Sequence, residues 1–149
     1  MSFDAFIGWL EKTAGVQGPL EPDADGVVHL ACGELVVSLM EQDGCLLMMG
    51  PVCALPEDDG GRLAVDLLRG NFPGRPESDG VLSLSNDNMV CLHRRMPLEA
   101  AGEDELADGL EDFVVSLVGW RERVKNGPDG GEQPSERRED LRLDGFLRV

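Results

Sequence analysis

The chain has 149 residues, of which 42% are hydrophobic, and it carries 29 acidic against 13 basic side chains, a formal net charge of −16. This length and composition predict one globular domain with its own core, and they exclude a wholly disordered chain. The charge makes nucleic acid and anionic membrane surfaces unsuitable partners, because phosphate contacts depend on Lys and Arg.

The chain opens with a predicted helix over residues 2–13. Ser2 can cap this helix, and apolar side chains recur three or four residues apart, so that they share one face. They are Phe3, Phe6, Ile7 and Leu10, with Trp9 beside the stripe. The first residues contain neither a basic cluster nor a long apolar run, so no secretory signal is predicted here. No segment reaches the roughly 18 consecutive apolar residues of a membrane span.

Three apolar runs follow in quick succession, over residues 27–32, 35–40 and 45–52. The breaks between them are short, and each contains a glycine, Gly33 and Gly44. Short glycine-containing breaks between apolar runs are typical of antiparallel hairpins. We therefore predict three strands that form a meander.

The predicted strands place apolar side chains on both faces of the sheet. An antiparallel sheet with one solvated face alternates apolar and polar residues, whereas Leu35 to Val37 and Leu46 to Met49 do not alternate. Two interpretations remain open. Either another chain covers part of this surface, or a central strand is buried within the monomer.

Residues 56–61 open a second predicted helix, which ends at Gly70. It carries Leu63, Leu67 and Leu68. A glycine in a helix costs about 1 kcal/mol relative to alanine. Because residues 60 and 61 are both glycine, the helix is expected to begin only at Arg62.

The second half of the chain predicts a hairpin and a long helix. The hairpin joins residues 80–84 to 89–93 across a turn at 86–88. The helix begins with acidic residues at 103–105 and ends with basic ones at 121–125, each the sign that the helix dipole favours. One apolar stripe runs along it, formed by Leu106, Leu110, Phe113, Leu117, Trp120 and Val124.

The predicted fold class is α+β, an antiparallel sheet with three helices in the order α-β-β-β-α-β-β-α. The domain is expected to span residues 1–125. Residues 126–149 are expected to form a flexible C-terminal tail, because residues 129–140 are rich in Gly, Pro, Glu and Arg and nearly free of apolar side chains. Residues 141–147 are more apolar, and the sequence does not indicate where they would dock.

Cysteine and histidine are too few and too scattered to predict a metal site. The four cysteines lie in or beside apolar runs, none forms a Cys-x-x-Cys pair, and the chain has only two histidines. Buried thiols in a reducing compartment are the ordinary explanation. We expect no metal and no cofactor; the cysteines are Cys32, Cys45, Cys53 and Cys91.

No set of residues predicts an enzyme. His29 and His93 both fall in strand-like runs, where a partly buried histidine is commoner than a general base. The acidic residues 57–59 fit a helix N-terminus, where carboxylates are favoured. No glycine-rich phosphate loop or nucleophile elbow is present.

Several motifs together resemble one protein family. They are Leu-Leu-x-x-Asn-Phe at residues 67–72, Gly-x-Leu-x-Leu at 80–84, Val-Cys-Leu at 90–92 leading into Met-Pro-Leu at 96–98, and the last helix up to Trp120. In this order, with this length and acidity, the chain resembles the class I chaperones of type III secretion, the Tir-chaperone family. The resemblance covers residues 1–125.

The resemblance implies a cytoplasmic bacterial homodimer that binds the N-terminal region of a secreted effector protein. Such a chaperone holds the effector segment extended and keeps it competent for secretion, with no nucleotide and no folding cycle. It further implies that the second helix and the following strand form the dimer contact, here Leu63, Leu67, Leu68, Val81, Leu82 and Leu84.

The effector contact implied by the resemblance lies on the first helix and the first sheet. Effector segments in the family bind apolar patches and can add a strand to the sheet. Methionine suits such a patch because its flexible side chain adapts to varied sequences. The implied residues are Phe3, Phe6, Trp9, Val36, Leu46 and Met48; their ordinary alternative is a place in the core.

One rival interpretation fits the charge and the size. An acidic inhibitor, such as an immunity protein or antitoxin, would also be small and negative, and it would mask a basic toxin. The two interpretations differ in the partner. An inhibitor meets a folded enzyme mainly through charge, whereas a secretion chaperone meets an extended segment through apolar contact.

Overall fold

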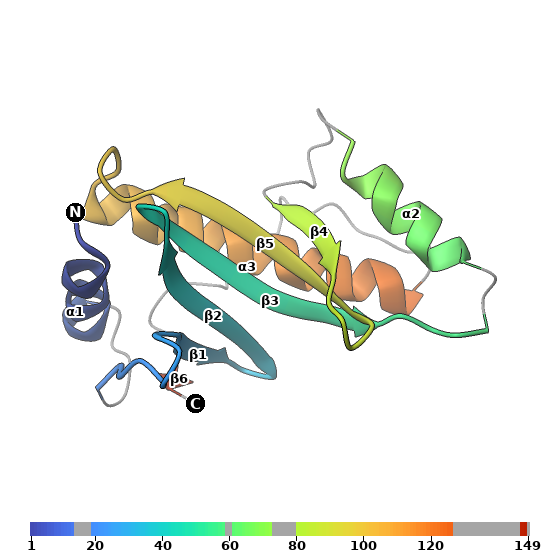
Figure 1. Cartoon of the computed structure of the whole chain (residues 1–149), viewed down its shortest axis with the longest axis horizontal. Helices are drawn as coiled ribbons and strands as arrows, with labels where there is room; N and C mark the ends of the chain where they lie inside the picture. Colours follow the sequence, from blue (N-terminus) through green and yellow to red (C-terminus); the bar gives the residue numbers. More distant parts are fainter. Residues whose placement is uncertain (14–18, 59–60, 73–79, 127–146, 149) are drawn as a thin grey trace.

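The computed structural model describes residues 1–13, 19–58, 61–72, 80–126 and 147–148. These residues form three helices and six strands, and Figure 1 shows how they are arranged. In chain order they are α1 (Phe3–Thr13), β1 (Val28–Cys32), β2 (Leu35–Gln42), β3 (Cys45–Ala54), α2 (Arg62–Gly70), β4 (Val81–Leu84), β5 (Met89–Pro97), α3 (Glu103–Asn126) and β6 (Leu147–Arg148).

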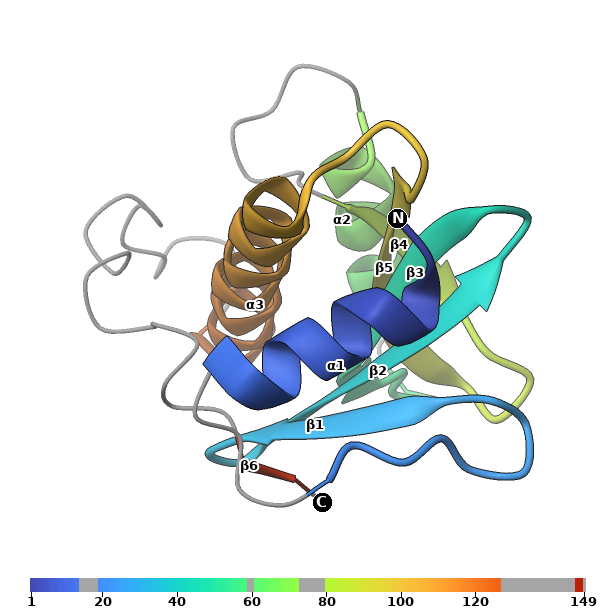
Figure 2. The same ribbon diagram turned by 90° about the vertical axis from the view of Figure 1, so that its left-hand side faces the viewer.

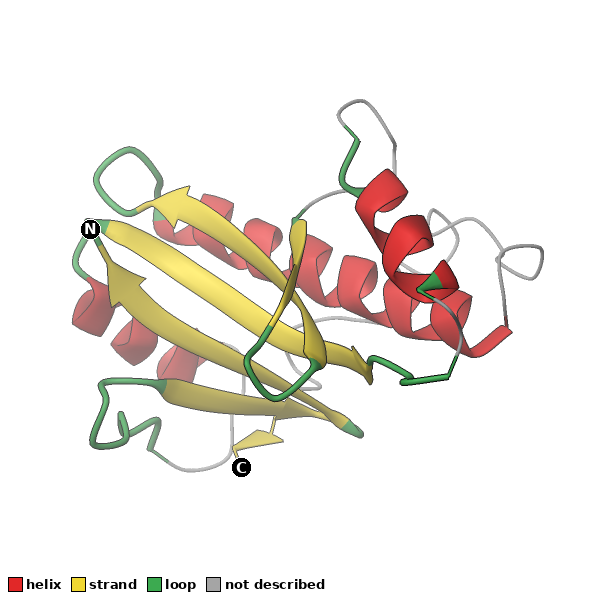
Figure 3. Ribbon diagram, turned by 45° about the vertical axis from the view of Figure 1, so that its right-hand side comes forward, coloured by secondary structure: helices red, strands yellow, loops and turns green. Residues whose placement is uncertain are grey.

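The strands form one antiparallel sheet in the order β4-β5-β3-β2-β1-β6 (Figure 3). The longest pairing joins β3 to β5, from Cys45 opposite Pro97 to Ala54 opposite Met89, with a bulge after Pro51. This pairing joins the N-terminal meander to the C-terminal hairpin, and α2 lies in the connection between them.

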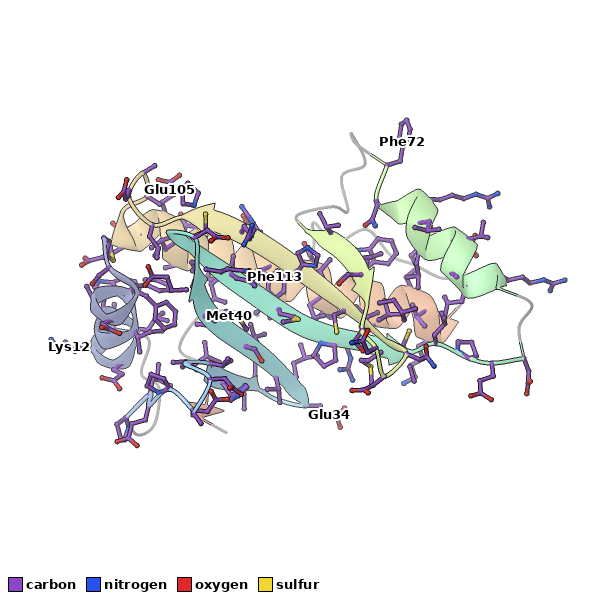
Figure 4. The ribbon with its side chains drawn as sticks, in the orientation of Figure 1. Lys12, Glu34, Met40, Phe72, Glu105 and Phe113 are labelled. Carbon is purple, nitrogen blue, oxygen red and sulfur yellow. The ribbon has the colours of Figure 1, made fainter. Side chains whose placement is uncertain are left out.

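Two of the helices, α1 and α3, pack on the same face of the sheet, and in the described chain no helix covers the opposite face (Figure 2). Gly50 on β3 lets the sheet approach α3 closely, because a Cβ added there would lie 2.3 Å from a methyl of Leu117. Phe113 lies in the core between the two layers (Figure 4).

The predicted order of three helices and five strands is confirmed. The observed α2 begins at Arg62, and Gly61 precedes it with φ of +79°, a left-handed conformation that glycine adopts without strain. Strands β2, β3 and β5 extend two to four residues beyond their predicted ends, to Gln42, Ala54 and Pro97.

The sequence did not predict β6, which pairs with the outer edge of β1 and makes the sheet six-stranded. Most of the predicted flexible tail lies outside the described residues. The domain boundary at residue 125 therefore stays a prediction, although α3 ends one residue later, at Asn126.

Candidate functional site

Among the described residues, all five large hydrophobic side chains that are clearly exposed lie in one region, on α2, just after it, and on β4. Their exposed fractions run from 47% to 71%, and they are Val65, Leu68, Phe72, Val81 and Leu84. Phe72 projects away from the molecule at the end of α2 (Figure 4). We call this region the α2–β4 surface. Clustered exposed apolar side chains usually mark an interaction site.

A groove with a volume of about 180 Å³ lies between α2 and β4 within this surface. Leu67, Leu82 and Val90 are buried and contribute to its lining. Leu68 and Leu84 also line it and are exposed. The groove therefore offers a pre-formed apolar site for side chains of a partner.

The backbone of Gly70 packs directly against the side chain of Trp120, and this contact fixes the C-terminal end of α2 against α3. Gly70 is buried, and a Cβ added there would lie 2.1 Å from the ring of Trp120. The Arg123 guanidinium lies 5.3 Å from the centroid of the same ring, a cation–π geometry. A larger residue at this position would therefore force the Trp120 ring or α2 to shift.

Asn71 fixes α2 to β4 with two hydrogen bonds. Its Nδ2 donates to the carbonyl oxygen of Leu82 at 2.9 Å, and its Oδ1 accepts from the Leu82 amide at 2.7 Å. The carboxamide thus takes the place of a neighbouring strand at the outer edge of β4. The sequence predicts no role for Asn71 beyond its place in the Leu-Leu-x-x-Asn-Phe motif, which is the only signal for this contact in the sequence.

The face of the sheet without a helix carries a second group of apolar residues, which we call the open sheet face. Strand alternation and cross-strand pairing place these side chains together, as in Met40 opposite Leu47 and Pro51 opposite Cys91. Each is half-buried, and the group consists of Val36, Met40, Leu47, Met49, Pro51 and Cys91. The sequence places apolar residues on both faces of the sheet, and among the described residues helices cover only one of these faces.

Four of the six residues that the resemblance implied for effector contact lie in the core. Phe3, Phe6, Leu46 and Met48 are between 0% and 6% exposed, so they are not available at the surface of this chain. All four belong to the one hydrophobic core, and the alternation along β3 puts Leu46 and Met48 on the face that packs against the helices. The other two, Trp9 and Val36, are half-buried at the surface, and the Trp9 ring stacks on Phe6 with centroids 6.2 Å apart.

The residues implied for dimer contact divide by exposure. Leu68, Val81 and Leu84 are exposed on the α2–β4 surface, and Leu63 is half-buried. The remaining two, Leu67 and Leu82, are buried and line the groove. The structure therefore brings the set together on neighbouring elements; its role as a dimer contact stays a prediction.

One hydrogen-bonded chain has the residue types of a hydrolase triad. His29 Nε2 lies 3.0 Å from Asp23 Oδ2, and His29 Nδ1 lies 3.1 Å from Ser38 Oγ. The backbone amide of Val27 and the His29 side chain hold the pKa of Asp23 below its usual range. Ser38 lies inside β2 with ladder pairing on both sides, so it lacks the free amide donors of an oxyanion hole. The hydrogen bonds between Asp23, His29 and Ser38 instead tie the loop before β1 to the sheet.

The thiols are free cysteines in partly buried settings. Desolvation by burial raises the pKa of three of them, Cys32, Cys53 and Cys91. Within the described ranges, no three or more His, Cys, Asp or Glu side chains are grouped so as to hold a metal ion. None of the described helices combines the length and apolar character that crossing a membrane requires.

Comparison with known proteins gives one family and several solved structures. The model of the Tir chaperone protein (CesT) family matches residues 6–121. No curated protein sequence matches the chain.

Three of the solved structures that match are complexes, and each is under 25% identical to this chain. A chain of the HopA1–SchA chaperone–effector complex is 18% identical with a TM-score of 0.66, over 80% of this chain and 93% of its own length. The Yersinia pestis chaperone SycH, solved with a YscM2 fragment, is 19% identical with a TM-score of 0.60, over 78% and 98%. A chain of the Pseudomonas aeruginosa ExoU–SpcU complex is 14% identical with a TM-score of 0.61, over 83% of this chain and 94% of its own length.

Proposed function

We infer the function from one premise: the chain belongs to the Tir chaperone protein (CesT) family and is a type III secretion chaperone whose partner is a secreted effector. We propose that it acts in the bacterial cytoplasm by binding alone, with no cofactor and no catalytic step. The fold shared with chaperones solved in complex with their partners supports this proposal. The inhibitor alternative finds no support in the family match or in the solved structures.

The observation that carries the proposed mode of action is the α2–β4 surface. A soluble monomer that exposed Leu68, Phe72 and Val81 together would leave apolar area in water, and a second copy of the chain could cover it. We propose that this surface is the homodimer contact. The groove that Leu67 and Leu82 line would receive exposed side chains from the other copy, as in a two-fold interface where the same patch meets itself.

The dimer proposal is tested by Leu68→Asp. The Leu68 side chain is 70% exposed, so the substitution leaves the fold of one chain intact but would place an unpaired charge in the contact. Sedimentation should report twice 16.1 kDa for the wild type and a shift toward 16.1 kDa for the variant. Ala5→Asp, an exposed apolar-to-acidic change on α1, is the matched control and should not shift. A wild type that sediments as a monomer contradicts the proposal.

We propose that the effector segment binds the open sheet face and the adjoining surface of α1. The half-buried Trp9 and Val36 and the methionines Met40 and Met49 form the apolar contacts in this proposal. Because apolar contact and main-chain pairing would carry the binding, it should survive moderate salt. The expected partner is a segment of roughly 50 to 100 residues near the N-terminus of the effector, a span scaled to standard or larger interfaces.

The effector proposal is tested by co-expression with an effector-like protein encoded nearby, followed by limited proteolysis. A protected N-terminal fragment that has no folded state of its own supports the chaperone function. Met49→Asp should weaken that complex while leaving the dimer intact, and Ala54→Asp, an exposed position at the end of β3, is the control. A partner that binds only as an intact folded domain, with an affinity that collapses as salt rises, would favour the inhibitor instead.

A further inference from the structure

The five-stranded sheet that the family fold predicts has two edges, β4 and β1, and each is occupied differently. An exposed strand edge presents unpaired amide and carbonyl groups, and it can accept a strand from another chain. At β4, the carboxamide of Asn71 satisfies both backbone groups of Leu82. A strand cannot add along β4 without breaking these two hydrogen bonds, so β1 is the more accessible edge for strand addition.

The β1 edge is held by the C-terminal end of the same chain. Strand β6 pairs antiparallel with β1, with Leu30 opposite Arg148 and Ala31 opposite Leu147. The chain therefore supplies its own strand at the edge to which an extended partner segment would add.

This self-pairing is short. Strand β6 has two residues, whereas β1 has five and pairs with β2 over all five, from Val28 to Cys32. A strand in a globular protein typically has five or six residues. A partner strand that paired with the whole of β1 would make more main-chain hydrogen bonds than β6 makes, so it could displace β6.

We propose that β6 is an internal competitor that covers the β1 edge until an extended effector segment replaces it. This inference rests on the proposed function and deepens it, because it assigns a regulating segment to the effector site. The covered edge would keep the unloaded chaperone from pairing with other strands, including those of further copies of itself.

The test uses the full chain with Leu147→Pro and Arg148→Pro combined. Proline has no amide hydrogen and does not fit a strand ladder, so β6 cannot pair. The control carries two prolines at Ser135 and Glu136, within the same C-terminal region. Hydrogen exchange measured by NMR should be at least tenfold faster in the variant for the β1 amides that face β6, and unchanged in the control.

A second readout is binding of a labelled peptide with the sequence of residues 141–149. It should bind the proline variant at least tenfold more tightly than the wild type or the control, because only the variant has an empty β1 edge. Unchanged exchange together with equal peptide binding would overturn the inference.

The effector separates this inference from the proposed function. Binding of the effector to both wild type and variant, with the β6–β1 pairing still protected in the wild-type complex, would overturn the inference alone. Absence of effector binding in both proteins would overturn the proposed function, and the exchange and peptide results would still decide whether β6 covers the edge.

Discussion

Asn71 lets the contact between α2 and β4 be tested at the level of single atoms. Replacing Asn71 with alanine removes two hydrogen bonds and leaves the amide and the carbonyl of Leu82 without their partner. Each lost bond costs about 1 kcal/mol net when water can partly replace it, so the expected loss is about 2 kcal/mol. In a domain of this size, 1 kcal/mol corresponds to about 2 to 4 °C in Tm, which predicts a fall of about 4 to 8 °C.

Asn71→Asp refines the same test because it keeps the shape and one of the two bonds. A carboxylate still accepts from the Leu82 amide, but it repels the Leu82 carbonyl oxygen, where the amide nitrogen of Asn71 donated. A proton on the new carboxyl would restore a donor, so its pKa should be raised in the folded state. The stability deficit relative to wild type should therefore be present above that pKa and shrink as the pH falls through it.

The assay is thermal unfolding by circular dichroism at one fixed protein concentration, because association makes Tm depend on concentration. Asn86→Ala in the exposed β4–β5 turn is the control and should change Tm little. An Asn71→Ala variant that unfolds within about 1 °C of the wild type would show that the two bonds contribute almost nothing to stability.

Three further predictions follow from the described contacts. Gly70→Ala should cost about 1 to 3 kcal/mol in denaturant unfolding, because its methyl would meet the Trp120 ring, whereas Gly102→Ala, with no atom within 4 Å, should not. A chain ending at Gly127 lacks β6 but should still unfold cooperatively, because α3 ends at Asn126; loss of the cooperative transition would show that the fold depends on the pairing of β6 with β1. Iodoacetamide should modify three thiols more slowly in the native than in the unfolded protein near pH 7, with the gap narrowing as the pH rises, because burial raises the pKa of Cys32, Cys53 and Cys91.

The sequence was sufficient for the order of elements because each carries a local signal. The helical spacing in α3 and the glycine-containing turns between β1, β2 and β3 depend only on neighbouring residues. The start of α2 at Arg62 was likewise predicted from the cost of Gly60 and Gly61 in a helix. Signals of this kind do not depend on how the elements pack.

The choice of sheet face could not be made from the sequence. A period of two places Leu46 and Met48 on one face of β3 and Leu47 and Met49 on the other. All four are apolar, so the pattern does not say which pair faces the helices. The inferred effector set contained Leu46 and Met48, but the structure puts this pair in the core and Leu47 and Met49 on the open sheet face.

Two other features depend on contacts between distant residues. Asn71 reaches Leu82 across eleven positions, and a lone asparagine after a helix is more often a turn residue than an edge cap. Strand β6 pairs two residues at the end of the chain with residues 30 and 31, and a two-residue strand has too few positions to show a period.

The pairing of β3 with β5 has a consequence for how the chain is made. Strand β3 ends at Ala54 and its partner ends at Pro97, so 43 more residues must be synthesised before the pair can close along its whole length. At about 5 to 20 residues per second this takes roughly 2 to 9 seconds. During that interval β3 is paired with β2 on one side, and on the other side its backbone amides and carbonyls have no partner strand. A secretion chaperone thus passes through a stage of its own synthesis at which its central strand is unshielded.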